Sequence, residues 1–222
     1  MKVITREALP SPCPMPGREA RITCIGLVQT RWYDAADAHT EQLREGVSAC
    51  AGAGANVVFL PELTLCRYPA DRRPEGPANA SAEDLESGPS LALARELARE
   101  CDVHVQISLF ERSGAADQRG LNSSIIVAPN GECVGRTRKL HIPVTEGYFE
   151  DHYFTEGPAD DPYPVHSLEL DGVASRWATR PAGMSGSLKW RVAMHSPALT
   201  CSVTPPPSAP NPTTRISTPH HC

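Results

Sequence analysis

Short apolar runs alternate with amphipathic helical patterns through the first part of the chain, and this alternation limits the fold to a few classes. Four runs predict strands because they are continuously apolar or alternate with period two, at residues 22–29, 57–60, 103–110 and 122–127. Two segments repeat apolar residues at helical spacing, at 37–53 and 91–100. Strands separated by helices bury their apolar residues in a sheet that helices cover, so the sequence predicts an α/β fold.

A basic run and an aromatic loop follow between Val134 and Phe154. Turn residues at 129–131 and the proline at 143 bound an extended segment, which predicts a strand with Lys139 near its end. On spacing alone, Arg136, Arg138 and Lys139 could instead be the solvated face of an edge strand. The next loop holds four of the nine Phe and Tyr residues beside three carboxylates, which indicates a lined pocket. These loop residues are Tyr148, Phe149, Tyr153 and Phe154, with Glu146, Glu150 and Asp151.

Two glutamates come directly after predicted strands. Glu62 follows the run at 57–60, at the strand end where open α/β sheets place their sites. It is either a surface residue or a half-buried general base whose pKa burial raises and a lysine such as Lys139 balances. Glu111 follows the strand at 103–110 in the same way, which predicts that it lines the same rim as Glu62.

The cysteines and histidines give no metal or disulfide pattern. The eight cysteines lack paired spacing, which favours reduced thiols in a cytoplasm over a disulfide framework or a zinc site. Cys66 lies beyond the strand end that carries Glu62, so we interpret it as structural rather than as a nucleophile. His104 has no second histidine at metal spacing. We therefore predict no metal site.

Charge and composition divide the chain into three parts. All 26 acidic residues lie at or before Asp171, and this acidic body argues against nucleic acid and fits a cationic small substrate. No apolar run is long enough to cross a bilayer. Prolines in residues 1–21 predict a disordered leader, and 22–171 is the predicted domain. Residues 172–222 hold no acid and no sustained strand or helix pattern, which predicts an aberrant, disordered tail.

Four motifs together resemble the nitrilase, or carbon-nitrogen hydrolase, superfamily. They are Pro-Glu-Leu at 61–63, Ile-Ser-Leu-Phe-Glu-Arg at 107–112, Leu-Asn-Ser-Ser-Ile at 121–125 and Arg-Lys-Leu-His-Ile-Pro at 138–143. The loop Gly147-Tyr148-Phe149-Glu150, followed by Tyr153-Phe154-Thr155, is most similar to the N-carbamoylputrescine amidase branch. The resemblance covers residues 22–170, in order and at family-like spacing.

The resemblance implies an α-β-β-α sandwich, here incomplete at the C-terminus, and a cytoplasmic homo-oligomer. It also implies a Glu-Lys-Cys triad without metal or organic cofactor, acting on a small carbamoyl amine or amide. Glu62 would be the general base and Lys139 the cation that stabilises the oxyanion. Glu150 would be a second glutamate beside the site, and Tyr148 and Glu111 would line it. The family's cysteine, in a Cys-Trp-Asp or Cys-Tyr-Asp context, is missing from this sequence.

A frameshift explains both the missing cysteine and the unusual tail. The third base of each codon can be read with the first two bases of the next, beginning at Pro181 and Ala182. That frame permits Cys-Trp-Asp-Glu-Trp-Phe-Pro-Glu-Val-Ala-Arg through Val192, a string that resembles the branch's nucleophile strand. The hypothesis is that the chain descends from an amidase and has lost its nucleophile.

Two other function classes remain open from the sequence. The chain could be a non-catalytic binding or subunit-interaction protein that uses the acidic, aromatic pocket without chemistry. Alternatively, its basic tail could bind an acidic partner, although five dispersed basic residues after Asp171 are few for this purpose.

Overall fold

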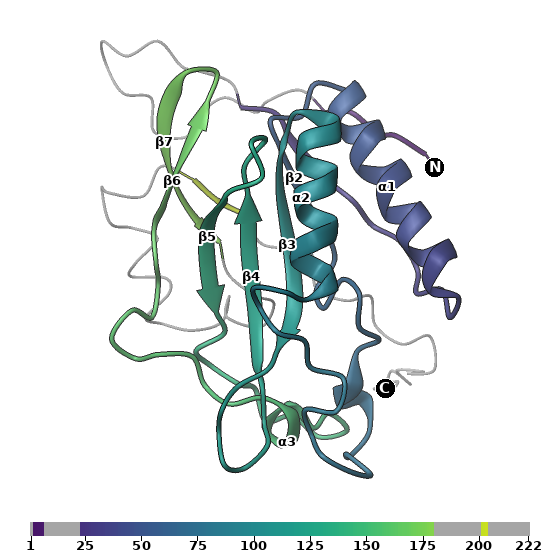
Figure 1. The fold of residues 1–222 in the computed structure, drawn as a ribbon, viewed down its shortest axis with the longest axis vertical. Helices are drawn as coiled ribbons and strands as arrows, with labels where there is room; N and C mark the ends of the chain where they lie inside the picture. Colours follow the sequence, from purple (N-terminus) through teal and green to yellow (C-terminus); the bar gives the residue numbers. More distant parts are fainter. Residues whose placement is uncertain (1, 7–22, 180–200, 204–222) are drawn as a thin grey trace, which may run out of the picture.

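A five-stranded sheet forms the middle of the structure, with helices on one face and a smaller sheet on the other (Figure 1). The computed structural model describes residues 2–6, 23–179 and 201–203. The strands of the larger sheet, in spatial order, are β1 Ile25–Leu27, β2 Val57–Phe59, β3 His104–Glu111, β4 Leu121–Val127 and β5 Cys133–Arg138. The first three run parallel, and β4 and β5 are each antiparallel to the strand before them.

Two helices, α1 (Ala36–Gly52) and α2 (Pro89–Cys101), lie side by side on one face of this sheet (Figure 1). Their apolar residues pack against every second residue of the strands, because side chains alternate between the two faces of a sheet. The core on this face includes Leu43, Val47, Leu91 and Leu97 from the helices and Val58, Val105, Ile107 and Ile125 from the strands. A short 3₁₀-helix, η1 (Pro69–Asp71), and a four-residue helix, α3 (Glu150–Tyr153), lie in the connecting segments.

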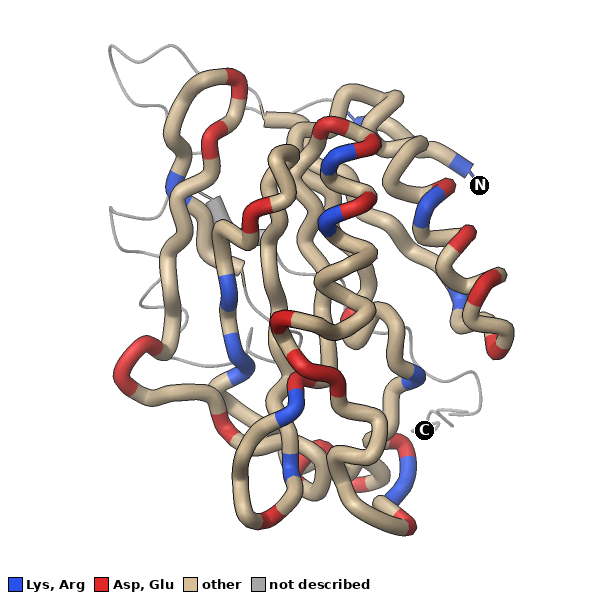
Figure 2. Tube along the Cα trace, viewed as in Figure 1, with Lys and Arg blue, Asp and Glu red and all other residues tan. Residues whose placement is uncertain are grey.

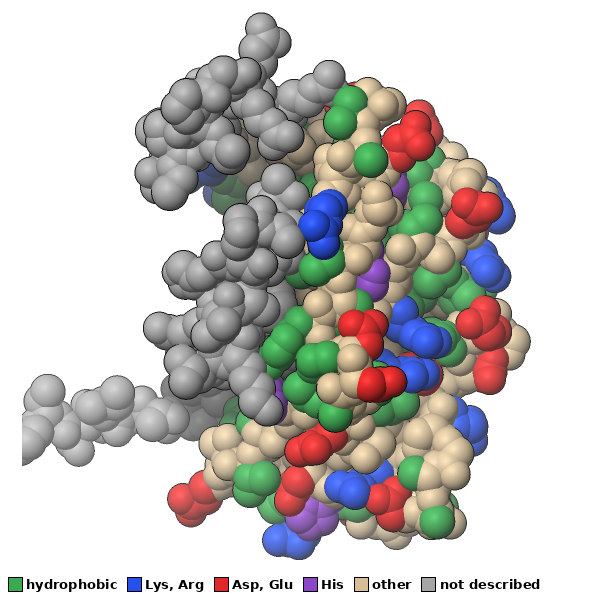
Figure 3. Space-filling model, turned by 90° about the vertical axis from the view of Figure 1, so that its left-hand side faces the viewer, with side chains coloured by type: hydrophobic (Ala, Val, Ile, Leu, Met, Phe, Trp, Pro, Cys, Tyr) green, Lys and Arg blue, Asp and Glu red, His purple; other side chains and the backbone are tan. Residues whose placement is uncertain are grey.

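A three-stranded sheet covers the opposite face with β6 (His166–Leu170), β7 (Val173–Thr179) and β8 (Cys201–Val203). The strands β6 and β7 form an antiparallel hairpin, and β8 is parallel to β7. The contact between the sheets is apolar at one end, where Leu168, Leu170 and Trp177 pack against Val57, Phe59 and Ile126. Figure 3 shows basic and acidic side chains next to one another on the side of the molecule that carries this hairpin. The described residues therefore form α, β and β layers.

The strand β7 corrects one prediction. Residues 172–222 were predicted to hold no sustained strand, yet β7 pairs with β6 from Val173 to Trp177. Asp171 and Gly172 have φ angles of 51° and 71°, and two left-handed residues in succession form the tight turn of a two-residue hairpin. Asp-Gly between two alternating segments is a strong hairpin signal. The predicted domain boundary at 171/172 therefore falls inside a hairpin.

The other elements follow the predictions closely. Both predicted helices and the predicted strands are present, with ends shifted by a few residues, and the α/β class is confirmed. Leu27, in the apolar run at 22–29, is nevertheless 54% exposed. It lies in β1, which pairs only with β2 in the described part of the sheet.

Several predictions lie partly or wholly outside the described residues. Most of the predicted leader at 1–21 is outside, and so are 180–200 and 204–222 of the predicted tail. Among the helices that the structure does describe, none is both long enough and apolar enough to cross a membrane.

A side chain from outside the helix caps the N-terminus of α2. The residue before the helix is Gly88, which has no side chain to accept a hydrogen bond. The Glu83 carboxylate takes this role, accepting from the Ser90 amide at 2.8 Å and from the Ser90 hydroxyl at 2.5 Å. The Glu83 amide and carbonyl in turn bond to Phe110 and Arg112, at the end of β3. Glu83 thus joins the start of α2 to the central sheet.

We expect the substitution Glu83→Ala to lower the free energy of unfolding by about 1 kcal/mol, because it removes the acceptor for a free helical amide. Urea unfolding followed by circular dichroism measures the change. Glu75→Ala, at an exposed position, is the control and should leave the midpoint unchanged. Equal effects of the two substitutions would contradict the capping role.

Candidate active site

The buried ammonium of Lys139 lies between two carboxylates. Its Nζ donates to Glu150 Oε2 at 2.6 Å and lies 3.7 Å from Glu62 Oε1. The Lys139 side chain is 1% exposed, against 8% for Glu150 and 21% for Glu62. The structure therefore brings together the three residues that the sequence singled out, and leaves Glu62 as the one that solvent reaches.

Glu62 is held by the turn that follows β2. The Thr64 hydroxyl donates to the Pro61 carbonyl at 2.7 Å, and the Thr64 amide donates to the Ser108 carbonyl of β3 at 2.8 Å. The His39 ring of α1 bonds to the Thr64 carbonyl at 2.8 Å. Leu63 has a φ of 49° and is 1% exposed, a strained conformation that burial of its side chain maintains. The turn is thus tied to its neighbours on two elements.

Lys139 and Glu150 are positioned by separate parts of the chain. Lys139 directly follows β5, and its amide donates to the Asn122 carbonyl at 2.8 Å. Glu150 begins the short helix α3, and its Oε1 accepts from the Tyr68 hydroxyl at 2.7 Å. Burial and this hydrogen bond raise the pKa of Tyr68, so it remains a neutral donor to the carboxylate. Glu150 therefore has both oxygens engaged.

The environment of Glu62 favours its protonated form more than water does. Burial raises the pKa of its carboxyl, while the Lys139 ammonium and the Asn122 amide oppose that shift. The Asn122 Nδ2 donates to Glu62 Oε1 at 2.8 Å. A carboxyl with a raised pKa can take and return protons near neutral pH, as a general base must. The electrostatics of the site therefore suit proton transfer at Glu62.

Two residues of this cluster were not identified from the sequence. Asn122 touches both Glu62, through its side chain, and Lys139, through its carbonyl. Its polarity at the start of an otherwise buried strand was the available signal. Tyr68 lies 82 positions before Glu150, and no local pattern reports such a contact.

Glu111 does not join this cluster. Its carboxylate forms an ion pair with Arg138 and accepts from the Ser123 hydroxyl at 2.6 Å. Ser123 and Asn122 are successive residues of β4, so their side chains point to opposite faces of the sheet. Because Asn122 binds Glu62, Glu111 lies on the face away from Glu62. The prediction that both glutamates line one rim is wrong in geometry, since strand-end position does not fix the face.

Tyr148 lies at the outer edge of the site. It is 49% exposed, and its ring centroid is 6.4 Å from that of Tyr68, in an edge-to-face arrangement. Cys66, by contrast, directs its sulfur to the Arg67 carbonyl and the Ser81 hydroxyl. None of the five cysteines whose side chains are described hydrogen-bonds to Glu62 or Lys139. In the described part of the chain, no group of His, Cys, Asp and Glu residues is arranged to hold a metal ion.

Residues 24–174 match the family model described as carbon-nitrogen hydrolase. The chain is 32% identical over 126 residues to the N-carbamoylputrescine amidase of Arabidopsis thaliana, covering 56% of this chain and 40% of that protein. It is 28% identical over 135 residues to the citrullinase of Francisella tularensis, covering 61% and 46%. The chain thus spans about half the length of the curated relatives it matches.

Solved structures share the fold. A carbon-nitrogen hydrolase from Helicobacter pylori aligns with a TM-score of 0.57 at 22% identity, over 71% of this chain and 50% of that one. A mutant amidase from Nesterenkonia sp. AN1, in which acrylamide has added to the active-site cysteine, aligns with a TM-score of 0.52 at 18% identity, over 70% and 56%. The chain therefore shares its fold with these two proteins over about 70% of its length.

Asn122→Ala should raise the pKa of Glu62 further, because the substitution removes a donor that stabilises the carboxylate. A pH titration by NMR of ¹³C-labelled glutamate carboxyl groups measures the shift, and Glu62→Gln identifies the signal. Asn130→Ala is the matched control, since that amide binds Glu132 instead. An unchanged or lowered pKa in Asn122→Ala would refute the coupling.

Glu62 should also make folding stability depend on pH. A carboxyl whose pKa is raised in the folded state binds more protons than the unfolded chain does, from about pH 4.3 up to its folded pKa. The free energy of unfolding therefore falls as pH rises through that window. In Glu62→Gln this fall should be smaller. Urea unfolding at several pH values tests the difference, and identical slopes would contradict it.

Proposed function

Because the chain belongs to the carbon-nitrogen hydrolase family, we propose that it descends from an amidase that hydrolyses a linear N-carbamoyl amine to the amine, carbon dioxide and ammonia. The substrate that we propose is N-carbamoylputrescine, whose product putrescine would connect the reaction to polyamine synthesis. The observation that carries the proposal is the buried Lys139 ammonium between Glu62 and Glu150. The N-carbamoylputrescine amidases among the relatives support the choice of substrate.

In this proposal Glu62 transfers protons and Lys139 stabilises charge. A carbamoyl carbon is a poor electrophile, so the family's cysteine thiolate attacks it while Glu62 takes the thiol proton and returns it to the leaving amine. The negative charge that develops on the carbonyl oxygen meets the Lys139 ammonium, which is already in place. Water then hydrolyses the acyl-enzyme, with Glu62 again acting as the base.

Glu150 has a supporting role in this scheme. Its carboxylate offsets the cost of burying the Lys139 charge, and the Tyr68 hydroxyl occupies its second oxygen. Glu62 therefore need not neutralise Lys139 alone and keeps a raised pKa. The exposed Tyr148 ring and the acidic surroundings suit a substrate with a cationic amine at its far end.

The nucleophile is the missing part of the scheme. Cys66 lies elsewhere, and Cys201 and Cys222 have no family-like context in the sequence. Under the frameshift hypothesis, the cysteine that lies one frame away at Pro181 and Ala182 completes the triad. The chain as written would then keep the base and the lysine but lack covalent catalysis.

A non-catalytic binding protein is the second candidate. The same observation on cysteines favours it, because the side chains of Glu62, Lys139 and Tyr148 could still bind a carbamoyl amine without a nucleophile. The resemblance also implies a cytoplasmic homo-oligomer. We include this assembly in the proposal only, because the chain spans about half the length of its relatives.

Ammonia release from N-carbamoylputrescine tests the proposal with three proteins: the chain as written, the frame-restored protein, and the restored protein with its new cysteine changed to alanine. We expect activity only in the second, and a loss of several powers of ten without the nucleophile. Comparable release from the first two would refute the frameshift account. Activity in the third would refute the nucleophile assignment. Binding of the substrate by the first protein, together with no release by any of the three proteins, would support the second candidate.

A further inference from the structure

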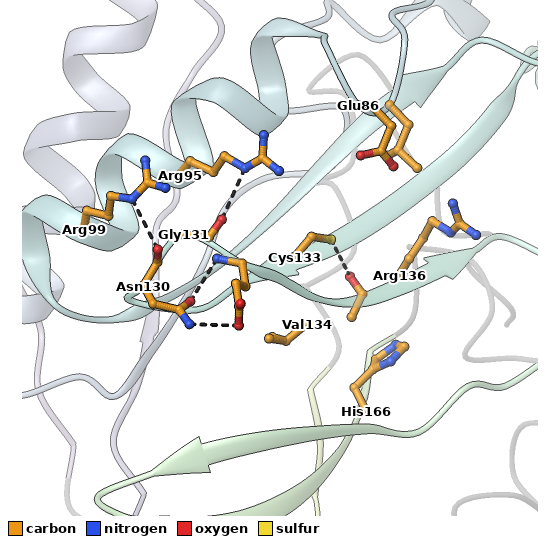
Figure 4. A pocket seen from close by; sticks show the side chains of 12 residues that line it. Glu86, Arg95, Arg99, Asn130, Gly131, Cys133, Val134, Arg136 and His166 are labelled. Atoms are coloured by element: carbon orange, nitrogen blue, oxygen red, sulfur yellow. Dashed lines mark hydrogen bonds between the residues drawn. The ribbon is translucent and has the colours of Figure 1, made fainter.

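An open hollow lies outside the residue cluster of the candidate active site. It has a volume of about 950 Å³ and lies beside α2, over the start and middle of β5 (Figure 4). The residues that carry charge around it are Arg95 and Arg99 of α2, Arg136 of β5, Glu86 and Glu132, and His166 of β6 adds a ring. The hollow extends along β5 to Arg136, three residues before Lys139, but Glu62, Lys139 and Glu150 are not among the residues that line it. The two sites are therefore separate.

No described carboxylate forms an ion pair with the three arginines of this hollow. Arg44, Arg67, Arg119 and Arg138 each form an ion pair within the described part of the chain. Arg95, Arg99 and Arg136 form none with any described carboxylate, although Figure 2 shows acidic positions next to basic ones along α2. The three guanidinium groups around the hollow are thus not engaged in ion pairs with the described part of the chain.

Two of these arginines are held in place by the backbone of the β4–β5 turn. The Arg95 Nε donates to the Gly131 carbonyl at 3.2 Å, and the Arg99 Nε donates to the Asn130 carbonyl at 3.4 Å (Figure 4). Gly131 has a φ of 86°, and a Cβ there would lie 2.2 Å from an Arg99 terminal nitrogen. The glycine therefore permits the close approach. These bonds use Nε and leave the terminal nitrogens of both side chains as donors.

The two glutamates that line the hollow offset only part of the positive charge of its three arginines. The Glu132 carboxylate accepts a hydrogen bond from the Asn130 side-chain amide at 2.8 Å, so one of its oxygens already has a partner that is not an arginine. Glu86 is exposed and lies on the side of the hollow away from Asn130 and Gly131 (Figure 4). Burial lowers the pKa of His166, whose Nε2 lies 3.2 Å from the Thr137 hydroxyl, so the ring adds polarity rather than charge near pH 7. The positive charge comes from the arginines.

We propose that this hollow binds a small anion that carries phosphate or carboxylate groups. Planar guanidinium groups bind both kinds of oxyanion through paired N–H donors. Because Arg95 and Arg99 are already ordered by the turn, binding loses less side-chain entropy than it would at two free arginines. The ligand would bridge Arg136 to the Arg95 and Arg99 pair across the hollow. The site is independent of the hydrolytic function proposed above.

Calorimetric titration of the full chain with inorganic pyrophosphate, and separately with citrate, tests the proposal and distinguishes the two kinds of group. We expect saturable binding of at least one anion, weaker at higher salt because the charges are exposed. Arg136→Gln should weaken binding about tenfold or more, because it removes a positive charge from the hollow. The Arg136 side chain forms no hydrogen bond or ion pair with another described residue, so the substitution should leave the fold unchanged. Arg99→Gln should weaken it as well.

Arg72→Gln is the control, because it removes the same charge at an exposed position away from the hollow. It should bind like the unchanged chain. Absence of saturable binding by both anions would overturn the proposal, and so would equal weakening in Arg72→Gln and Arg136→Gln. Circular dichroism spectra of the variants establish that any loss is not caused by unfolding.

Discussion

The arrangement of the candidate site depends on one buried charge, the Lys139 ammonium. An isolated ammonium that is 1% exposed would lose several kcal/mol of hydration energy, so the fold must supply opposite charge and hydrogen bonds. Glu150 provides the short contact and Glu62 the longer one. Each carboxylate then needs its own partner, which explains the Tyr68 hydroxyl on Glu150 and the Asn122 amide on Glu62. Five side chains from separated parts of the sequence are thus linked through a single cation.

Much of this could be predicted from the sequence, and the failures have a common cause. Period and strand-end position identified the helices, the strands and Glu62, while the family resemblance identified Lys139 and Glu150. Glu111 was assigned to the wrong face because it is the last residue of β3, where the alternation of side chains along the strand directs it away from Glu62. Tyr68 was not found because its contact with Glu150 joins distant segments. Local patterns specify elements, whereas contacts between elements decide which polar residues meet.

The hairpin β6–β7 shows a different kind of error. Composition dominated the interpretation of residues 172–222, where the absence of acids and the many prolines indicated an irregular tail. The local signal at Asp171 and Gly172 was stronger than that average, since both residues adopt the left-handed conformation of a tight turn. Burial of Trp177 against Ile126 then supplies apolar contact that holds β7 to the larger sheet. A segment of unusual composition can therefore begin with ordinary structure.

Arg138 and Lys139 are neighbours in the sequence, yet they form ion pairs on opposite faces of the sheet, with Glu111 on one side and with Glu62 and Glu150 on the other. A one-residue slip of β5 along β4 would reverse both side chains and separate both sets of charges. The apolar pattern of β5 is weak, since Gly135, Arg136 and Thr137 occupy its middle. The ion pairs therefore favour the observed register of β5 on β4. A shifted register would leave the Lys139 ammonium buried without a carboxylate partner.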